Sequence, residues 1–137
     1  MPQELKSVMG IAAFGMKAQG TRLKVIAQNV ANAASTAEKT GGDPYRRQIV
    51  AFGSELDKAL KAQVVTIKDI QRDNSAFNSV YDPNHPAANE EGFVLMPNVN
   101  ALVEMMDMRE AQRSYEANLN VLDTAKSMMS RTLDMLR

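Results

Sequence analysis

The first 34 residues place apolar side chains at the spacing of an amphipathic helix. Most of these positions recur every seven residues, with others three residues later. They are Met9, Ala12, Met16, Leu23, Ile26, Val30 and Ala33. A narrow stripe with this period is typical of a helix that pairs with another helix in a coiled coil. Gly10, Gly15 and Gly20 each weaken a helix by about 1 kcal/mol relative to alanine. This helix should therefore need a partner surface to be stable. The glycines, which have no side chain, allow such a surface to come close.

The last part of the chain, residues 98–137, repeats the seven-residue period more strongly. Its large apolar positions are Met108, Tyr115, Leu119, Leu122, Met129, Leu133 and Leu136. Asn100 is the predicted N-cap, and no glycine or proline follows it. At ~1.5 Å per residue this helix would be roughly 55 Å long, too long for the remainder of the chain to cover. We therefore interpret both stripes as subunit-packing seams rather than as a purely internal core.

The centre of the chain, residues 35–97, has a different pattern. Residues 35–44 are polar and turn-rich, which predicts a loop. β-branched residues and two-residue alternation predict short strands, which cover residues 47–52, 64–72 and 77–81. The predicted fold is therefore mainly α, with long terminal helices (residues 1–34 and 98–137) paired as a coiled coil and a small β-containing middle.

Two further segments of the centre carry weaker signals. Residues 54–61 are expected to form a helical turn between strands. Residues 82–98 contain three prolines and few periodic positions, so they are expected to form ordered loops. Burial of Phe93, Val94 and Leu95 should anchor these loops.

Composition and charge exclude several classes of function. The chain has 137 residues, 45% of them hydrophobic, which favours one compact unit with extended elements attached. Sixteen basic and sixteen acidic residues give a net charge of zero, so neither nucleic acid nor an acidic membrane surface is an expected partner. The longest uncharged run, residues 25–37, contains five polar residues and predicts no membrane insertion. The first six residues carry no net positive charge, so no cleaved signal is expected.

Candidate catalytic chemistry is sparse. There is no cysteine and a single histidine, and the glycine-rich phosphate-binding and serine-nucleophile motifs are missing. Asp82, His85 and Glu91 could be combined into a metal or acid–base site, but a structural histidine in a turn is the favoured interpretation. Residues 45–47, Tyr-Arg-Arg, are either an anion site or, as we favour, the start of a strand with exposed arginines. We expect no enzyme activity, metal, cofactor or small-molecule substrate.

Two runs near the chain ends resemble the signatures of the bacterial flagellar rod and hook proteins. The first is Ala18-Gln19 with residues 22–33, and the second is residues 98–118. Residues 42–47 and 80–92 are similar to the C-type proximal rod members of this family, although Gln28 stands where the family commonly has an asparagine. The positions that match the motifs are Asn29, Asn32, Pro44, Tyr45, Arg46, Arg47, Asn98, Val99, Asn100, Glu104, Arg113, Tyr115, Glu116 and Asn118.

The resemblance implies a structural subunit of the proximal rod of the flagellar basal body, which crosses the periplasm. In this family the terminal helices form an inner coiled-coil layer of a helical tube, and the β-containing middle lies outside it. The implied partners are other rod proteins, copies of the same chain and the flagellar type III export apparatus, which passes the subunit unfolded. The assembled rod transmits motor torque to the hook. The alternative hypothesis is a soluble coiled-coil adaptor or export chaperone, which would be absent from purified basal bodies.

Overall fold

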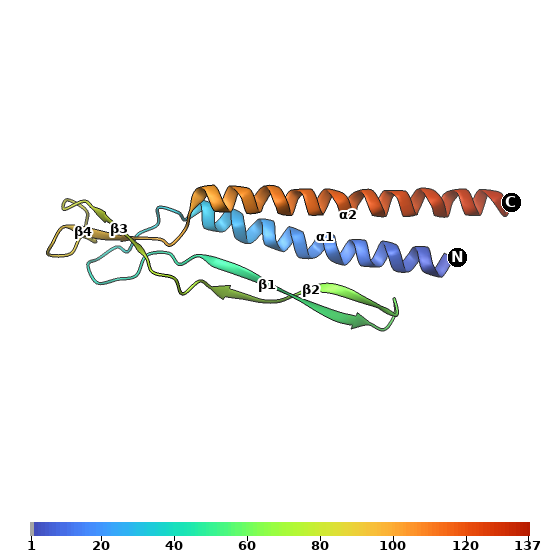
Figure 1. Cartoon of the computed structure of the whole chain (residues 1–137), viewed down its shortest axis with the longest axis horizontal. Helices are drawn as coiled ribbons and strands as arrows, with labels where there is room; N and C mark the ends of the chain where they lie inside the picture. Colours follow the sequence, from blue (N-terminus) through green and yellow to red (C-terminus); the bar gives the residue numbers. More distant parts are fainter. Residues whose placement is uncertain (1) are drawn as a thin grey trace. The chain divides into compact units, whose positions relative to one another are not determined.

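The computed structural model describes residues 2–137, which contain two long helices and four strands (Figure 1). The elements are α1 (Pro2–Ala31), β1 (Gln48–Asp57), β2 (Ala62–Arg72), β3 (Asn78–Tyr81), β4 (Phe93–Met96) and α2 (Ala101–Met135). The strands form two separate two-stranded sheets, β1 with β2 and β3 with β4. The prediction of long terminal helices around a small β-containing middle is therefore confirmed.

Short-range hydrogen bonds fix the C-terminal end of α1 and the N-terminal end of α2. The Asn100 side-chain oxygen accepts the backbone N–H of Leu102 at 3.0 Å and of Val103 at 3.3 Å, so the predicted N-cap of α2 is confirmed. At the end of α1, the Asn32 amide donates to the Gln28 carbonyl at 2.8 Å. The helix ends three residues earlier than the periodicity predicted, because the backbone changes to turns: the Ala33 N–H donates to the Val30 carbonyl and the Ser35 N–H to the Asn32 carbonyl.

The hairpin between β1 and β2 corrects the helical turn that we expected over residues 54–61. Residues 54–57 belong to β1, and only residues 58–61 form a turn. The Asp57 carboxylate accepts the N–H groups of Ala59 and Leu60, both at 2.9 Å, and Lys61 adopts φ of 50°. An aspartate whose side chain binds the N–H groups of a turn in this way competes with helix formation. This explains why β1 extends as far as Asp57 and a tight turn follows it.

The second hairpin corrects the loop that we expected over residues 82–98. Residues 93–96 form β4, which pairs antiparallel with β3 so that Val80 lies opposite Val94 and Tyr81 opposite Phe93. Only Val94 is buried, at 1% exposure, whereas Phe93 and Leu95 are 41% and 43% exposed. Strand alternation places Val94 on the opposite face from its two neighbours, so of these three residues Val94 alone anchors this segment, together with the buried Pro97.

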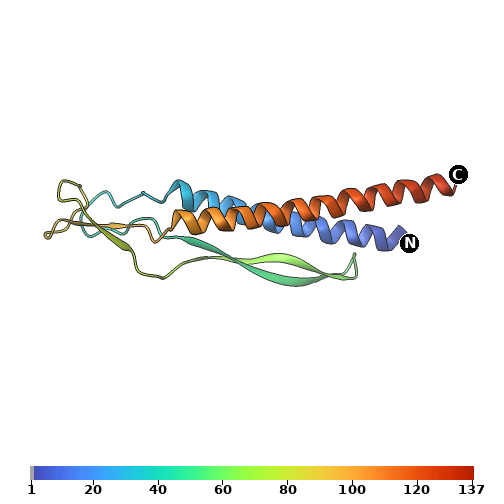
Figure 2. The ribbon, with the colours of Figure 1, turned by 45° about the horizontal axis from the view of Figure 1, so that its top comes forward.

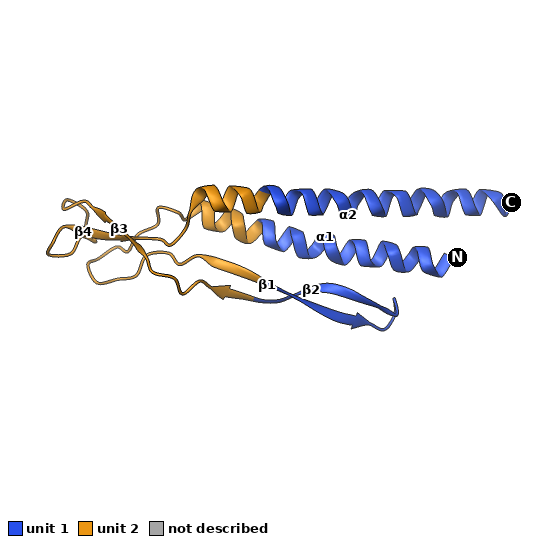
Figure 3. Cartoon of the chain, in the orientation of Figure 1, with its two compact units in different colours: residues 1–23, 51–69, 109–137 blue, residues 24–50, 70–108 orange. Residues whose placement is uncertain are grey.

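The chain divides into two compact units, coloured separately in Figure 3. Unit 1 comprises residues 1–23, 51–69 and 109–137, and unit 2 comprises residues 24–50 and 70–108. Within unit 1, α1 lies between α2 and the β1–β2 hairpin (Figures 1 and 2). Within the described residues, neither helix combines the length and the apolar character needed to cross a membrane.

Two of the three glycines in α1 mark close contacts inside unit 1. A Cβ atom at Gly10 would lie 2.5 Å from a methyl group of Leu60 in the hairpin turn. At Gly15 it would lie 2.9 Å from the side-chain amide of Asn118 on α2. No atom lies within 4 Å of such a Cβ at Gly20. The close approach that we predicted for the glycines therefore occurs at Gly10 and Gly15 but not at Gly20.

The same substitution should have opposite effects at Gly15 and Gly20. Gly20→Ala should stabilise the protein by about 0.5–1 kcal/mol, because alanine favours a helix and the site is open. Gly15→Ala should destabilise it by about 1–2 kcal/mol, because overpacking of the Asn118 amide outweighs the gain in helix propensity. Urea unfolding of the two variants measures the sign and size of each change in the free energy of unfolding. Adding Asn118→Ala should recover most of the loss at Gly15, and equal effects at the two glycines would contradict the contact.

Candidate functional site: a buried polar cluster

Six polar side chains from separate segments of unit 2 meet in what we call the polar cluster. Its members are Asn29, Tyr45, Arg47, Asp73, Asn98 and Glu104. Asn29 lies near the end of α1 and Glu104 in the first turn of α2, and both are almost fully buried, at 1% and 0% exposure. The other four lie in the segments before β1, after β2 and after β4.

The Asn29 amide uses its full hydrogen-bonding capacity. Its oxygen accepts the Tyr45 hydroxyl at 2.8 Å and the Gln48 N–H at 2.9 Å. Its nitrogen donates to the Gln48 carbonyl at 2.8 Å and to a Glu104 carboxylate oxygen at 3.2 Å. Asn29 thus binds both backbone groups of Gln48, as a neighbouring strand would, and joins the start of β1 to both helices.

Arg47 is the cationic centre of the polar cluster. Its Nε donates to Glu104, its Nη1 lies 3.3 Å from Asp73, and its Nη2 lies 3.5 Å from Asp107. Its backbone N–H donates to the Asn98 side-chain oxygen at 2.8 Å. A buried carboxylate such as Glu104 is tolerated only when paired and hydrogen-bonded, and Arg47 and Asn29 together meet that requirement.

Neighbouring polar groups extend the polar cluster to the segment after β2. The Asn98 amide donates to the Asp73 carbonyl at 3.0 Å, and Arg46 donates to the same carbonyl at 3.0 Å. The Arg46 guanidinium also stacks 4.2 Å from the centre of the Phe77 ring. Our interpretation of residues 45–47 as a strand with exposed arginines is therefore wrong, because all three precede β1 and bind groups of unit 2.

Burial and charge shift three ionisation equilibria in the polar cluster. Burial, reinforced by the Glu104 charge, raises the pKa of the Tyr45 hydroxyl. Burial opposes the charged form of Arg47, but its hydrogen bonds and charge interactions with Glu104 and Asp73 leave its pKa raised. Hydrogen bonds from the backbone and side chain of Ser75, with a further one from Arg47, lower the pKa of Asp73. All three shifts favour the protonation states that the hydrogen bonds require.

Asp73 should make the stability of the protein depend on acid pH. Its folded-state pKa is lowered, so its contribution is fully present above its ordinary pKa and is lost as pH falls through the folded value. Asp73→Asn should lower the stability of the protein at pH 7. The further decrease in stability between neutral and acid pH should be smaller in the variant than in the unmodified protein. Urea unfolding midpoints measured at several pH values test this. An unchanged pH profile in the variant would contradict the role of this carboxylate.

His85 has structural partners. Its Nε2 lies 3.2 Å from the Thr36 hydroxyl, and its Nδ1 accepts the Ala87 N–H at 3.0 Å. These bonds hold the turn after β3 against the loop that follows α1. In residues 2–137 no group of three or more histidine, cysteine, aspartate or glutamate side chains is arranged to hold a metal ion, and this includes the set of Asp82, His85 and Glu91.

The structure places the remaining motif residues in several environments. Pro44 and Val99 are buried beside the polar cluster, and Asn32 and Asn100 bind the helix ends. Four others lie on α2 in unit 1, where Arg113 and Glu116 are exposed and Tyr115 and Asn118 are half-buried. The motif therefore covers the polar cluster, the ends of the helices and part of the α2 face that carries Asn118.

The predicted seam positions also differ in exposure. Ile26 is buried, and seven are half-buried: Met9, Met16, Leu23, Met108, Tyr115, Leu122 and Met129. Four are exposed in the single chain: Val30, Leu119, Leu133 and Leu136. These four side chains are between 37% and 77% exposed, so the single chain leaves part of the predicted seam uncovered.

Sequence reasoning missed Asp73, Asp107 and Gln48. Asp73 carries a local signal, since Asp-Asn-Ser is typical of a turn, and its carboxylate accepts the Ser75 N–H at 2.9 Å. Gln48 contributes only backbone groups, which no sequence pattern marks. Each polar atom described above has a partner in unit 2, so the polar cluster is a structural joint.

Comparison with known proteins agrees with this structural role. Residues 90–135 match the family described as "Flagellar basal body rod FlgEFG protein C-terminal". Over 133 residues the chain is 47% identical to "Flagellar basal-body rod protein FlgC" of Agrobacterium fabrum, covering 97% of this chain and 96% of the relative. The protein of the same name from Buchnera aphidicola is 44% identical over 130 residues, covering 94% and 96%. That of Bacillus subtilis is 36% identical over 142 residues, covering 93% and 95%.

Two long terminal helices joined by a polar cluster, together with these matches, define a structural protein of the flagellar axis and not an enzyme. Its place is the rod of the flagellar basal body. Within that class, the chain belongs to the FlgC family of flagellar basal-body rod proteins.

Proposed function

We propose that this chain polymerises with copies of itself and with other rod proteins into the proximal part of the flagellar rod, which transmits motor torque to the hook. Residues 1–34 and 98–137 form its coiled-coil layer, and residues 35–97 form the middle region outside it. The observation that carries the proposal is the apolar surface that α2 leaves exposed. Large apolar side chains on this helix that are at least 37% exposed are Leu102, Val103, Met105, Met106, Leu119, Val121, Met128, Leu133 and Met135, and Leu136 directly after the helix is exposed as well.

The burial pattern of α2 supports the coiled-coil part of the proposal. Its buried and half-buried positions alternate by four and three residues along one face. Nine positions follow this alternation: Glu104, Met108, Ala111, Tyr115, Asn118, Leu122, Ala125, Met129 and Thr132. The two other half-buried positions, Asp107 and Ser114, directly precede Met108 and Tyr115. This alternation is the seven-residue repeat of coiled coils. Inside unit 1 the face meets α1, since Asn118 contacts Gly15 and Glu110 pairs with Arg22 at 3.4 Å.

The exposed apolar surface of α2 favours a subunit over a free-standing protein. Scattered apolar side chains are normal on a protein surface, but many of them along one helix favour an interaction site. Contacts of one kind that repeat without closing build a helical filament. A stiff drive shaft needs such packing along its whole length and requires no catalytic group.

The partners that we propose follow from the same features. The chain enters the flagellar type III export apparatus unfolded, and its helices pair after export, when burial in the seam offsets the cost of ordering α1. The balanced charge supports the proposal that it binds neither nucleic acid nor a membrane surface. We propose no small-molecule substrate and no cofactor.

Purified basal bodies test the proposed function. A tagged copy of this chain should restore motility to a deletion strain and co-purify with the basal body after detergent and salt washing. A tagged cytosolic protein provides the control for carry-over. Finding the tagged chain only in the cytosol, bound to other subunits before their export, would favour an adaptor or chaperone instead.

A further inference from the structure

The tip of the β1–β2 hairpin touches α1 near the start of that helix. Leu60 lies over Gly10, where a Cβ atom would be 2.5 Å and 2.7 Å from the two methyl carbons of Leu60. The Ser7 hydroxyl, one turn earlier on the same face of α1, donates to the Leu60 carbonyl at 3.1 Å, a bond that it shares with the Gln3 carbonyl. The leucine side chain therefore fills a notch that exists because residue 10 is glycine.

The turn of the hairpin holds Leu60 in a defined position. The Asp57 carboxylate accepts the Leu60 N–H at 2.9 Å, while Ser7 binds the Leu60 carbonyl. Lys61 follows with φ of 50°, in the left-handed region that tight turns use. Both backbone groups of Leu60 are thus hydrogen-bonded, so its backbone cannot rotate without breaking one of these bonds.

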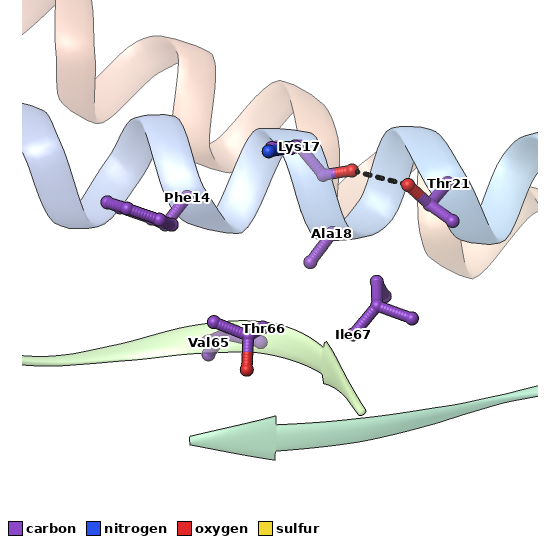
Figure 4. Close-up of a pocket in the computed structure, with 7 residues that line it drawn as sticks. All are labelled: Phe14, Lys17, Ala18, Thr21, Val65, Thr66 and Ile67. Atoms are coloured by element: carbon purple, nitrogen blue, oxygen red, sulfur yellow. Dashed lines mark hydrogen bonds between the residues drawn. The ribbon is translucent and has the colours of Figure 1, made fainter. Parts of the chain in front are cut away.

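Unfilled space borders this contact in both directions along α1. Before it lies a cavity of about 290 Å³, which is lined by the first two turns of α1 and by the hairpin turn. After it lies an open groove of about 260 Å³ between α1 and β2, where Phe14 and Ala18 face Val65 and Ile67 (Figure 4). Leu60 therefore bridges the two elements at a point where little other packing supports it.

The hairpin needs such an anchor. A two-stranded sheet on its own is at best marginally stable in water. Val64 is the one buried side chain in β1 and β2. Without the contact between Leu60 and Gly10, little would hold the tip of the hairpin in place.

We propose that Leu60, Gly10 and Ser7 form a clasp, which stays closed within one chain when the subunit is built into the rod. The hairpin tip then binds α1 of its own chain and is not exchanged with α1 of a neighbouring copy. Both sides of the clasp belong to one chain, so it closes without the loss of translational freedom that a contact between copies requires. The inference rests on the proposed function, because it concerns the conformation of this chain inside the rod.

A disulfide tests whether the clasp is closed in the rod. A Cβ at Gly10 would lie 3.2 Å from the Leu60 Cγ, which is one bond from the Leu60 Cβ, so cysteines at these two positions are within reach of each other. The chain has no cysteine of its own. Oxidation of purified basal bodies should convert most of the incorporated Gly10→Cys, Leu60→Cys chain to an intrachain disulfide, which migrates faster on a non-reducing gel. Gly20→Cys with Leu60→Cys is the matched control and should stay reduced, because Gly20 lies about 15 Å further along α1.

Packing variants test whether the clasp is needed for assembly. Gly10→Leu fills the notch, so it should lower the amount of this chain in basal bodies by about fivefold or more. Leucine favours a helix more than glycine does, so helix propensity cannot explain such a loss. Adding Leu60→Ala makes room for the new side chain and should restore incorporation to within about twofold. Gly20→Leu is the matched control and should have little effect, since no atom lies within 4 Å of a Cβ there.

Three results would overturn the inference while leaving the proposed function intact. The first is an incorporated Gly10→Cys, Leu60→Cys chain that forms no intrachain disulfide on oxidation. The second is a mixed dimer between two differently tagged copies, one with each single cysteine, because the hairpin tip would then bind a neighbour. The third is normal incorporation of Gly10→Leu, or no recovery when Leu60→Ala is added. Absence of the unmodified chain from basal bodies is a separate result, and it would contradict the proposed function itself.

Discussion

Asn29→Asp is expected to destabilise the protein by about 3–5 kcal/mol, a large fraction of the roughly 5–15 kcal/mol by which an ordinary domain is stable. The change is nearly isosteric, so packing is preserved and only chemistry differs. Aspartate has no N–H groups, so the Gln48 carbonyl and the Glu104 carboxylate each lose a donor. It also places a second buried negative charge beside Glu104, which is 0% exposed.

Thermal and urea unfolding of the purified chain measure this effect. Asn120→Asp is the matched control, because Asn120 lies exposed on α2 and the same charge there should change stability by less than about 0.5 kcal/mol. Glu104→Gln combined with Asn29→Asp should recover part of the loss by removing the repulsion. Equal stability of the two Asn→Asp variants would show that the polar cluster does not hold unit 2 together.

Leu122→Glu is expected to abolish incorporation into the rod, so that cells lack hooks and filaments. Leu122 lies at the centre of the seven-residue series on α2 and is half-buried in the single chain. Truncating a buried leucine to alanine costs about 2–5 kcal/mol, and an unpaired carboxylate in a packed seam costs more. Export should continue, because we propose that the chain travels unfolded. Motility assays and immunoblots of culture medium and basal bodies separate these steps.

Asp123→Asn is the control for Leu122→Glu. Asp123 is the next residue along α2 and is exposed, so its neutralisation should leave rod assembly nearly unchanged. Normal rods built from the Leu122→Glu chain would contradict the placement of this face in the seam. Stronger damage from Asp123→Asn would place in the seam the face about 100° further around the helix.

Half of the buried face of α2 was predictable from sequence, and the other half was not. The large apolar residues that recur every seven positions identify Met108, Tyr115, Leu122 and Met129. The alternate positions of the face hold small or polar residues: Ala111, Asn118, Ala125 and Thr132. Hydropathy instead favours Leu119 and Leu133, which are exposed in the single chain. Pairing two helices closely requires small side chains, and a search for large apolar ones overlooks them.

Strand β4 shows a different limit of sequence reasoning. Its four residues, Phe93–Met96, are too few for a periodic signal, and they become a strand by pairing with β3. The resemblance to rod proteins marked most of the polar cluster, including Asn29, Arg47 and Glu104, but it did not show that they touch. Their contacts join residues 16 to 75 positions apart along the chain, and no local pattern encodes such a distance.

The wide sequence span of the polar cluster dictates when unit 2 can form during synthesis. A ribosome releases the chain from its N-terminus, so Asn29 and Arg47 emerge long before Glu104. Until Glu104 appears, the Arg47 guanidinium and the Asn29 amide lack the carboxylate that joins them. Most of the chain must therefore be made before these contacts can form. Until then the nascent protein lacks the hydrogen bonds that connect Asn29 and Arg47 to α2. A chaperone or a transport channel thus has time to capture an open chain.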